Sequence, residues 1–118
     1  MIYINIQDKW EVCIFMQYDA LLIDCLRKLN CSEKTIKRAI RKTNQYNSGF
    51  TFSNLKLRAS VVYISPATSE SQWFNTLVHE LKHVQSHVCK YYDIEEDSED
   101  AAYLIGYLMQ QIITSARI

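Results

Sequence analysis

The segment that most constrains the fold is a long one-sided helix, predicted from Ser69 to about Lys90. Ser69 is followed three residues later by Gln72, the spacing of a capping box at a helix N-terminus. Apolar side chains then recur at helical spacing, at positions Leu77, Leu81, Val84 and Val88. Because a helix with one apolar side must bury that side, we expect it to pack on a sheet or on other helices.

Several shorter segments supply these partners. Residues 2–6, 10–18, 50–52 and 59–65 have the alternating or β-branched patterns of strands. Helices are predicted over about 19–29 and 32–43, and a last helix opens with an acid-rich first turn after the turn at 91–94 and runs to about 116. Only 2 Gly and 1 Pro are present, which argues against a small all-β fold with many tight turns. We therefore expect one α+β domain over residues 1–118, with a small N-terminal sheet and two long C-terminal helices.

Charge is unevenly distributed along the chain, although 13 basic and 13 acidic residues give a formal net charge of zero. Nine of the basic residues and a single acid, Glu33, lie between Arg27 and Arg58, so this stretch carries +8 and the remainder −8. The helix between Lys34 and Lys42 could contact nucleic-acid phosphates as part of a helix-turn-helix, or dock on the acidic start of the last helix. We favour a solvated face, because zero net charge gives no long-range attraction to DNA.

The cysteine pattern and the apolar segments of the sequence indicate the cellular compartment in which the protein is expected. Cys13, Cys25, Cys31 and Cys89 form no C-x-x-C pair and no zinc-ribbon spacing. The first residues lack the basic and apolar regions of a signal peptide, and no stretch is long and apolar enough for a transmembrane helix. We therefore expect a cytoplasmic protein with no membrane partner, whose reduced thiols pack as small apolar side chains.

The polar side of the long helix carries the sequence His79-Glu80-Leu81-Lys82-His83, an H-E-x-x-H motif. His79 and His83 are one helical turn apart on one face, so both imidazoles can bind one Zn²⁺ ion. Glu80 lies beside them, where it can accept a proton from water at the metal. Since the apolar side chains lie on the opposite side of the helical wheel, we expect the motif to face a cleft.

A catalytic zinc needs a third protein ligand. His87 continues the four-residue spacing, but it lies about 12 Å from His79 along a straight helix, so we interpret it as a surface residue. Cys89 would need a sharp bend after Ser86, where the sequence has no glycine. The last helix is therefore the better source of the ligand.

An antiparallel last helix would place Glu99 level with the two histidines. Ala102 and Gly106 follow on the same side, and small residues let two helix backbones approach closely. Glu99 is therefore the expected third ligand. Three other acids of the same run stay open as alternatives, namely Glu95, Glu96 and Asp100.

Two segments together resemble a known family. They are Thr76-Leu77-Val78-His79-Glu80-Leu81-Lys82-His83-Val84 and Glu99-Asp100-Ala101-Ala102-Tyr103-Leu104-Ile105-Gly106-Tyr107. They resemble the gluzincin branch of zinc metallopeptidases, and within it the small single-domain zincin-like proteins of bacterial, phage and mobile-element genomes. The resemblance covers roughly the last third to half of the chain and implies a minimal zincin-like fold. Lys82 and Gln85 depart from the uncharged and hydrophobic residues usual at these positions.

The resemblance also implies a reaction. One Zn²⁺ ion held by His79, His83 and Glu99 would polarise a water molecule. Glu80 would accept the proton of that water and pass it to the leaving amine of a peptide or protein substrate.

The tetrahedral intermediate of such a reaction needs a second electrophile, for which Tyr103 or Tyr107 is the candidate. Zincins hold an extended substrate against an edge strand beside the active-site helix, and residues 59–65 precede that helix directly. Two alternatives to a peptidase stay open. One is a DNA-binding or regulatory module with a structural or vestigial zinc, and the other is a protein-interaction domain without turnover.

Overall fold

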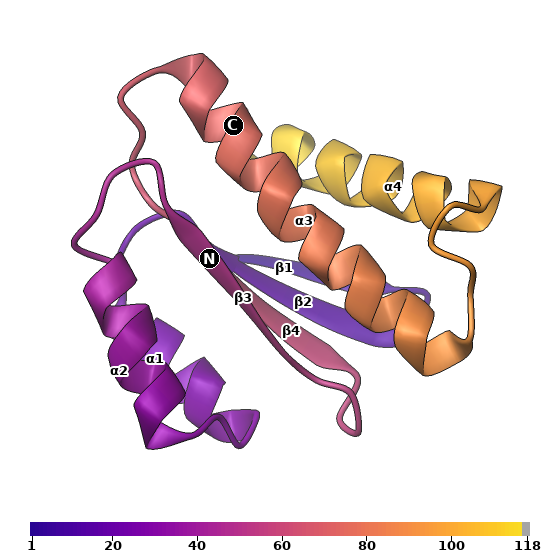
Figure 1. The fold of residues 1–118 in the computed structure, drawn as a ribbon, viewed down its shortest axis with the longest axis horizontal. Helices are drawn as coiled ribbons and strands as arrows, with labels where there is room; N and C mark the ends of the chain where they lie inside the picture. Colours follow the sequence, from indigo (N-terminus) through magenta and orange to yellow (C-terminus); the bar gives the residue numbers. More distant parts are fainter. Residues whose placement is uncertain (117–118) are drawn as a thin grey trace.

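The computed structural model describes residues 1–116, which form four strands and four helices. The strands are β1 (Ile2–Ile6), β2 (Trp10–Phe15), β3 (Gly49–Asn54) and β4 (Ala59–Ile64). The helices are α1 (Ala20–Lys28), α2 (Glu33–Lys42), α3 (Glu70–Tyr92) and α4 (Glu99–Ala116). The α+β class is confirmed, with a small sheet followed by two long C-terminal helices (Figure 1).

The strands form one mixed sheet in the order β1-β2-β4-β3. β1 and β2 are an antiparallel hairpin, with Gln7 and Asp8 in the left-handed backbone region at its turn. β2 pairs in parallel with β4, and β3 lies antiparallel to β4. A parallel pair cannot be joined by a tight turn, so the connection between β2 and β4 contains α1, α2 and β3.

β4 is an interior strand, which corrects the expectation that residues 59–65 form the edge strand beside the motif helix. All six residues of β4 are buried, because strands flank it on both sides and helices cover both faces of the sheet. The edge strand that contacts α3 is β3. A continuous apolar run such as Val61–Ile64 is typical of a strand buried on both faces.

Helices cover both faces of the sheet (Figure 1). α3 and α4 cover one face, with a core that includes Val12, Ile14, Val62, Leu77, Leu81 and Leu108. α1 and α2 cover the other face, with a core that includes Phe15, Val61, Tyr63, Leu22, Leu26 and Ile36. The sheet is therefore the middle of three layers.

Local sequence signals account for the ends of α3. The hydroxyl of Ser69 accepts a hydrogen bond from the Gln72 backbone N–H at 3.1 Å, so the helix begins where the capping box predicts. It ends at Tyr92, slightly beyond the predicted position near Lys90, and the residue that caps it, Asp93, has a left-handed backbone with φ 56°. Leu77, Leu81 and Val84 are fully buried, so the apolar face holds the helix on the sheet.

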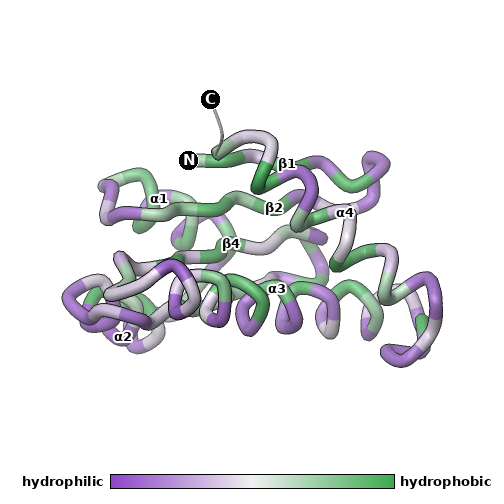
Figure 2. The backbone as a smooth tube through the Cα atoms, turned by 90° about the horizontal axis from the view of Figure 1, so that it is seen from above, coloured by the Kyte–Doolittle hydropathy of each residue, from purple (hydrophilic) through white to green (hydrophobic). Residues whose placement is uncertain are grey.

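α4 packs on a side of α3 that does not carry the histidines. The buried Gln85 donates from Nε2 to the backbone oxygen of Ala101 at 2.8 Å. Gln85 points more than a quarter turn away from His79 and His83 around the helix axis. From the C-terminal end of α3, α4 crosses towards β1 (Figure 2).

The part of the chain described here contains no helix with both the length and the apolar character needed to cross a membrane. The four cysteines are free thiols. Cys31 and Cys89 are buried, while Cys13 and Cys25 are partly buried, as expected of small side chains at the edges of a core.

Candidate metal and catalytic site

The imidazoles of His79 and His83 converge at one point beside α3. Their Nε2 atoms are 3.3 Å apart, and their ring centroids are 4.9 Å apart. Two nitrogen ligands of a tetrahedral zinc ion, each about 2.0–2.1 Å from the metal, are separated by about 3.3 Å. The pair therefore has the spacing of two ligands to one zinc ion, and both side chains are exposed to solvent.

Glu80 is fixed between α3 and the edge strand β3. Its Oε1 accepts a hydrogen bond from the Thr51 hydroxyl at 2.8 Å, and the same hydroxyl lies 3.2 Å from the Glu80 backbone oxygen. Only 5% of Glu80 is exposed. Gly49 makes this approach possible, since a Cβ at that position would lie 3.0 Å from Glu80 Cγ. One carboxylate oxygen is therefore engaged, and Oε2 is left for other partners.

His87 belongs to the same hollow, which corrects its interpretation as a surface residue. Its Nδ1 is 2.6 Å from Ser53 Oγ, and Ser53 Oγ is 2.6 Å from Ser60 Oγ. Trp10 Nε1 donates to Ser60 Oγ at 2.9 Å. A chain of hydrogen bonds thus connects a buried indole to the His87 imidazole through two strands.

The hydrogen-bond chain favours one tautomer of His87. An indole N–H can only donate, so Ser60 accepts from Trp10. Ser60 is buried, and its own hydroxyl hydrogen is satisfied by donating to Ser53; in the same direction, Ser53 donates to His87 Nδ1. That arrangement leaves a neutral imidazole with its proton on Nε2. The pKa of His87 is lowered by burial and, to a smaller extent, by the charges of His83 and Lys90, which also favours the neutral form.

The second wall of the hollow comes from α2. The hollow is about 440 Å³ and is lined by Thr35, Arg38, Ala39, Lys42, Gly49, Phe50, Thr51, Phe52, His79, Glu80, His83 and His87. Lys42 Nζ donates to the backbone oxygen of Gly49 at 3.0 Å. The hollow therefore lies along β3, with the motif on one side and two basic side chains on the other.

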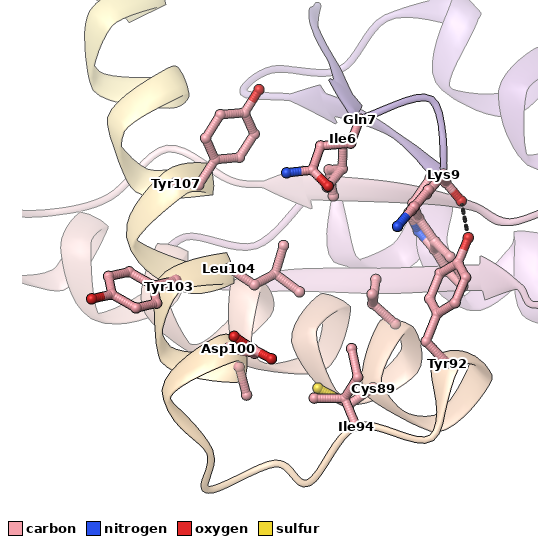
Figure 3. Close-up of a pocket in the computed structure, with 13 residues that line it drawn as sticks. Ile6, Gln7, Lys9, Cys89, Tyr92, Ile94, Asp100, Tyr103, Leu104 and Tyr107 are labelled. Carbon is pink, nitrogen blue, oxygen red and sulfur yellow. Dashed lines mark hydrogen bonds between the residues drawn. The ribbon is translucent and has the colours of Figure 1, made fainter.

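The structure does not bring Glu99, Tyr103 or Tyr107 to the histidine pair. All three line a separate hollow on α4, together with Ala102 and Gly106. Tyr103 and Tyr107 also lie at the rim of a cavity of about 540 Å³ between α3, α4 and the β1–β2 turn, and the Tyr103 hydroxyl points away from it (Figure 3). Nothing lies within 4 Å of a Cβ placed on Gly106, so the small residues of α4 do not mark a close contact between helices.

Among the four candidate acids, Glu96 contacts the motif itself. Its Oε2 lies 3.2 Å from Lys82 Nζ and accepts a hydrogen bond from Ser86 Oγ at 3.2 Å. These two hydrogen bonds, that of Lys82 first, lower the pKa of Glu96. Lys82 also donates to Gln85. The two residues that depart from the family pattern therefore form a network that connects α3 to the acidic loop.

The candidate metal site has two of its expected ligands together. Residues 1–116 contain no group of three or more His, Cys, Asp or Glu side chains arranged to hold a metal ion. His79 and His83 fit a zinc ion in donor type and spacing. A catalytic zinc would need a third ligand, and the loop before α4 carries a carboxylate that contacts the motif.

Sequence reasoning missed Thr51 and Ser53, and it did not place Arg38 and Lys42 of the basic helix at this site. The strand at 49–54 alternates, with Thr51 and Ser53 towards α3 and Phe50 and Phe52 in the core beneath α1 and α2. This period-two pattern could have assigned the polar side chains to the face of the motif helix. Nothing in the sequence could have placed α2 at the edge of the same strand.

Comparison with protein-family models, with curated proteins and with solved structures finds no match to this chain.

Proposed function

We propose that this protein is a zinc-dependent peptidase whose motif residues work in the hollow beside β3. The observation that supports this most directly is the 3.3 Å separation of the His79 and His83 Nε2 atoms, which fits two ligands of one zinc ion. The buried carboxylate of Glu80 lines the same hollow. Two zinc ligands beside a carboxylate that is not a ligand are among the groups that metal-assisted hydrolysis requires, together with a third ligand.

Glu96 is the acid that we propose as the third ligand, in place of Glu99. Its carboxylate contacts Lys82 within the motif and Ser86 one turn further along. Glu99 lines a hollow on α4, whereas the hollow that Glu96 lines also contains Ser86 and His87 of α3. A carboxylate is a common third ligand beside two histidines in catalytic zinc sites.

The protein side chains have separate roles in the proposed reaction. A bound zinc ion supplies positive charge that lowers the pKa of water and polarises the scissile carbonyl. Because Thr51 holds Oε1 of Glu80, Oε2 accepts the proton of the attacking water. Glu80 then returns this proton to the amide nitrogen as the C–N bond breaks, so that one water is consumed and an acid and an amine are formed.

His87 takes the role that the sequence assigned to Tyr103 or Tyr107. Its Nδ1 faces Ser53, so Nε2–H is the atom left to donate to the oxygen of the tetrahedral intermediate. β3 lies at the edge of the sheet along this hollow. An extended peptide can therefore pair with its main chain while the scissile bond lies beside Glu80.

Metal binding is the first test. The protein is purified with reductant, because its four free thiols fit the reducing cytoplasm in which we propose it works. It should then bind one zinc ion, as measured by elemental analysis and competitive dye titration. His79→Ala should abolish that binding, whereas Asn75→Ala, an exposed change one turn earlier, should not. Glu96→Ala should weaken zinc binding by more than about 100-fold, beyond what loss of an outer-shell partner costs, and Glu99→Ala should leave it unchanged.

Hydrolysis is the second test. Peptide mixtures incubated with the zinc-loaded protein should yield products by mass spectrometry, and Glu80→Gln should retain zinc but lose these products. If zinc is absent, or His79→Ala changes nothing, the peptidase proposal is wrong. If zinc is bound but Glu80→Gln has no effect on any activity, the metal is structural.

A further inference from the structure

Two basic side chains of α2 line the candidate site without forming an ion pair there. Arg38 and Lys42 line the hollow together with His79, His83 and Glu80. The ion pairs found within residues 1–116 are Arg27–Glu33 and Lys82–Glu96, so neither Arg38 nor Lys42 takes part in one. Two positive charges therefore line the hollow without an ion pair in this part of the chain, and the carboxylate that shares the hollow, that of Glu80, is hydrogen-bonded to Thr51. This also shows that the basic segment does not dock on the acidic start of α4 within the described molecule.

The position of β3 determines which part of a bound peptide would meet these charges. β3 is hydrogen-bonded to β4 on one side and is the edge strand on the other. Lys42 Nζ donates to the Gly49 backbone oxygen, which places its ammonium group directly at β3. The motif lies on the α3 side of the strand, and Arg38 lies on the α2 side.

An added strand has the same side-chain alternation as the strand it pairs with. Along β3, Thr51 and Ser53 point to α3, whereas Phe50 and Phe52 lie in the core of the other face. A peptide paired with β3 would likewise direct alternate side chains to α3 and to α2. The side chains on the α2 side would lie next to Arg38 and Lys42, where carboxylates are favoured and ammonium groups are repelled.

We propose that the substrate is an extended acidic peptide, with carboxylate side chains at alternate positions that are recognised by Arg38 and Lys42. The inference rests on the proposed function in taking the hollow as a substrate site. It gives the +8 segment a role, in place of the solvated face that the sequence favoured. Neutralising both side chains should lower peptide affinity by about tenfold, the scale of two solvent-exposed ion pairs.

Binding without turnover tests this proposal. The probe is a fluorescein-labelled peptide of alternating Glu and Val, acetylated and amidated so that its ends carry no charge, and the neutral reference peptide has Gln in place of Glu. Both are titrated by fluorescence anisotropy into zinc-loaded Glu80→Gln protein. The double variant R38Q/K42Q is compared with K34Q/K37Q, which removes the same charge from exposed positions of α2 outside the hollow.

The expected result is that the Glu peptide binds more tightly than the Gln peptide, and that R38Q/K42Q alone removes the difference. The charge-reversed variant R38E/K42E should instead bind a peptide of alternating Lys and Val more tightly than the Glu peptide. An equal loss in both double variants would overturn the proposal, since it would indicate the general field of the helix. So would tighter, Arg38-dependent binding of a DNA duplex of random sequence.

The two proposals can fail separately. Discrimination between the Glu and Gln peptides that depends on Arg38, in a protein that binds no zinc, would refute the peptidase and leave the acidic ligand in place. Zinc-dependent hydrolysis with no preference for acidic peptides would refute the acidic substrate and leave the peptidase proposal in place. Circular dichroism of each variant shows whether its fold is intact, and R38Q alone serves if loss of the Lys42 contact with Gly49 unfolds the double variant.

Discussion

Gly49→Ala is the substitution that tests the packing of the site most directly. A Cβ at this position would lie 2.6 Å from the Tyr63 backbone oxygen, 3.0 Å from Glu80 Cγ and 3.1 Å from Thr76 Cγ2. The φ angle of Gly49 is not positive, so the obstacle is steric rather than conformational. Tyr63 is on the paired strand β4, and its carbonyl cannot move without disturbing the pairing of β3 with β4.

The expected cost is that of overpacking, about 1–3 kcal/mol in the free energy of unfolding. Gly106→Ala is the matched control, since these are the 2 glycines of the chain and a Cβ on Gly106 meets nothing within 4 Å. In the middle of α4 this change should stabilise the protein by about 1 kcal/mol through helix propensity. The two Gly→Ala changes should therefore have opposite signs.

Urea unfolding followed by circular dichroism measures both variants. We expect the midpoint to fall for Gly49→Ala and to rise for Gly106→Ala, with equal slopes. At a temperature where the Gly49→Ala protein is folded, its rate of peptide hydrolysis should still be lower than that of the native protein. The loss of stability does not explain this decrease, which arises because the new methyl group displaces Glu80. A Gly49→Ala protein as stable as the native protein would refute the close packing of β3 against α3.

Three other predictions concern single side chains. Thr51→Val should lower the free energy of unfolding by about 1–3 kcal/mol in urea titrations, because Glu80 Oε1 loses its donor, and unchanged stability would contradict this. The pKa of His87 is lowered in the folded state. In the unfolded chain the pKa of His87 is about 6.5, so below this pH the unfolded chain binds more protons than the folded protein. The free energy of unfolding should therefore fall as the pH is lowered, and it should fall less in the His87→Gln variant. Burial first, and then Cys25, raise the pKa of the Cys13 thiol to about 11. Mass spectrometry at about pH 8 should therefore show slower alkylation of Cys13 in folded than in unfolded protein, and equal rates would show that the thiol is not shielded.

The sequence alone determined the elements and the first half of the site. The Ser69 capping box and the Leu77, Leu81 and Val84 spacing predicted α3 and its buried face, and both are observed. The spacing of His79 and His83 within one helix predicted that their rings converge, and their Nε2 atoms are 3.3 Å apart. These features depend on the 3.6-residue period of one helix, which the sequence contains in full.

Only the tertiary structure decided which other elements meet that helix. The sequence argument placed Glu99 level with the histidines along an antiparallel helix, but it could not give the direction in which α4 lies around α3. The contact between Gln85 and Ala101 sets that direction away from the histidines. Strand order likewise made β3 the edge strand, and brought α2 with Arg38 to the hollow. Strand order and helix azimuth follow from packing the whole core against both faces of the sheet. Both depend on many contacts between residues that are far apart in the chain, and no local pattern in the sequence contains these contacts.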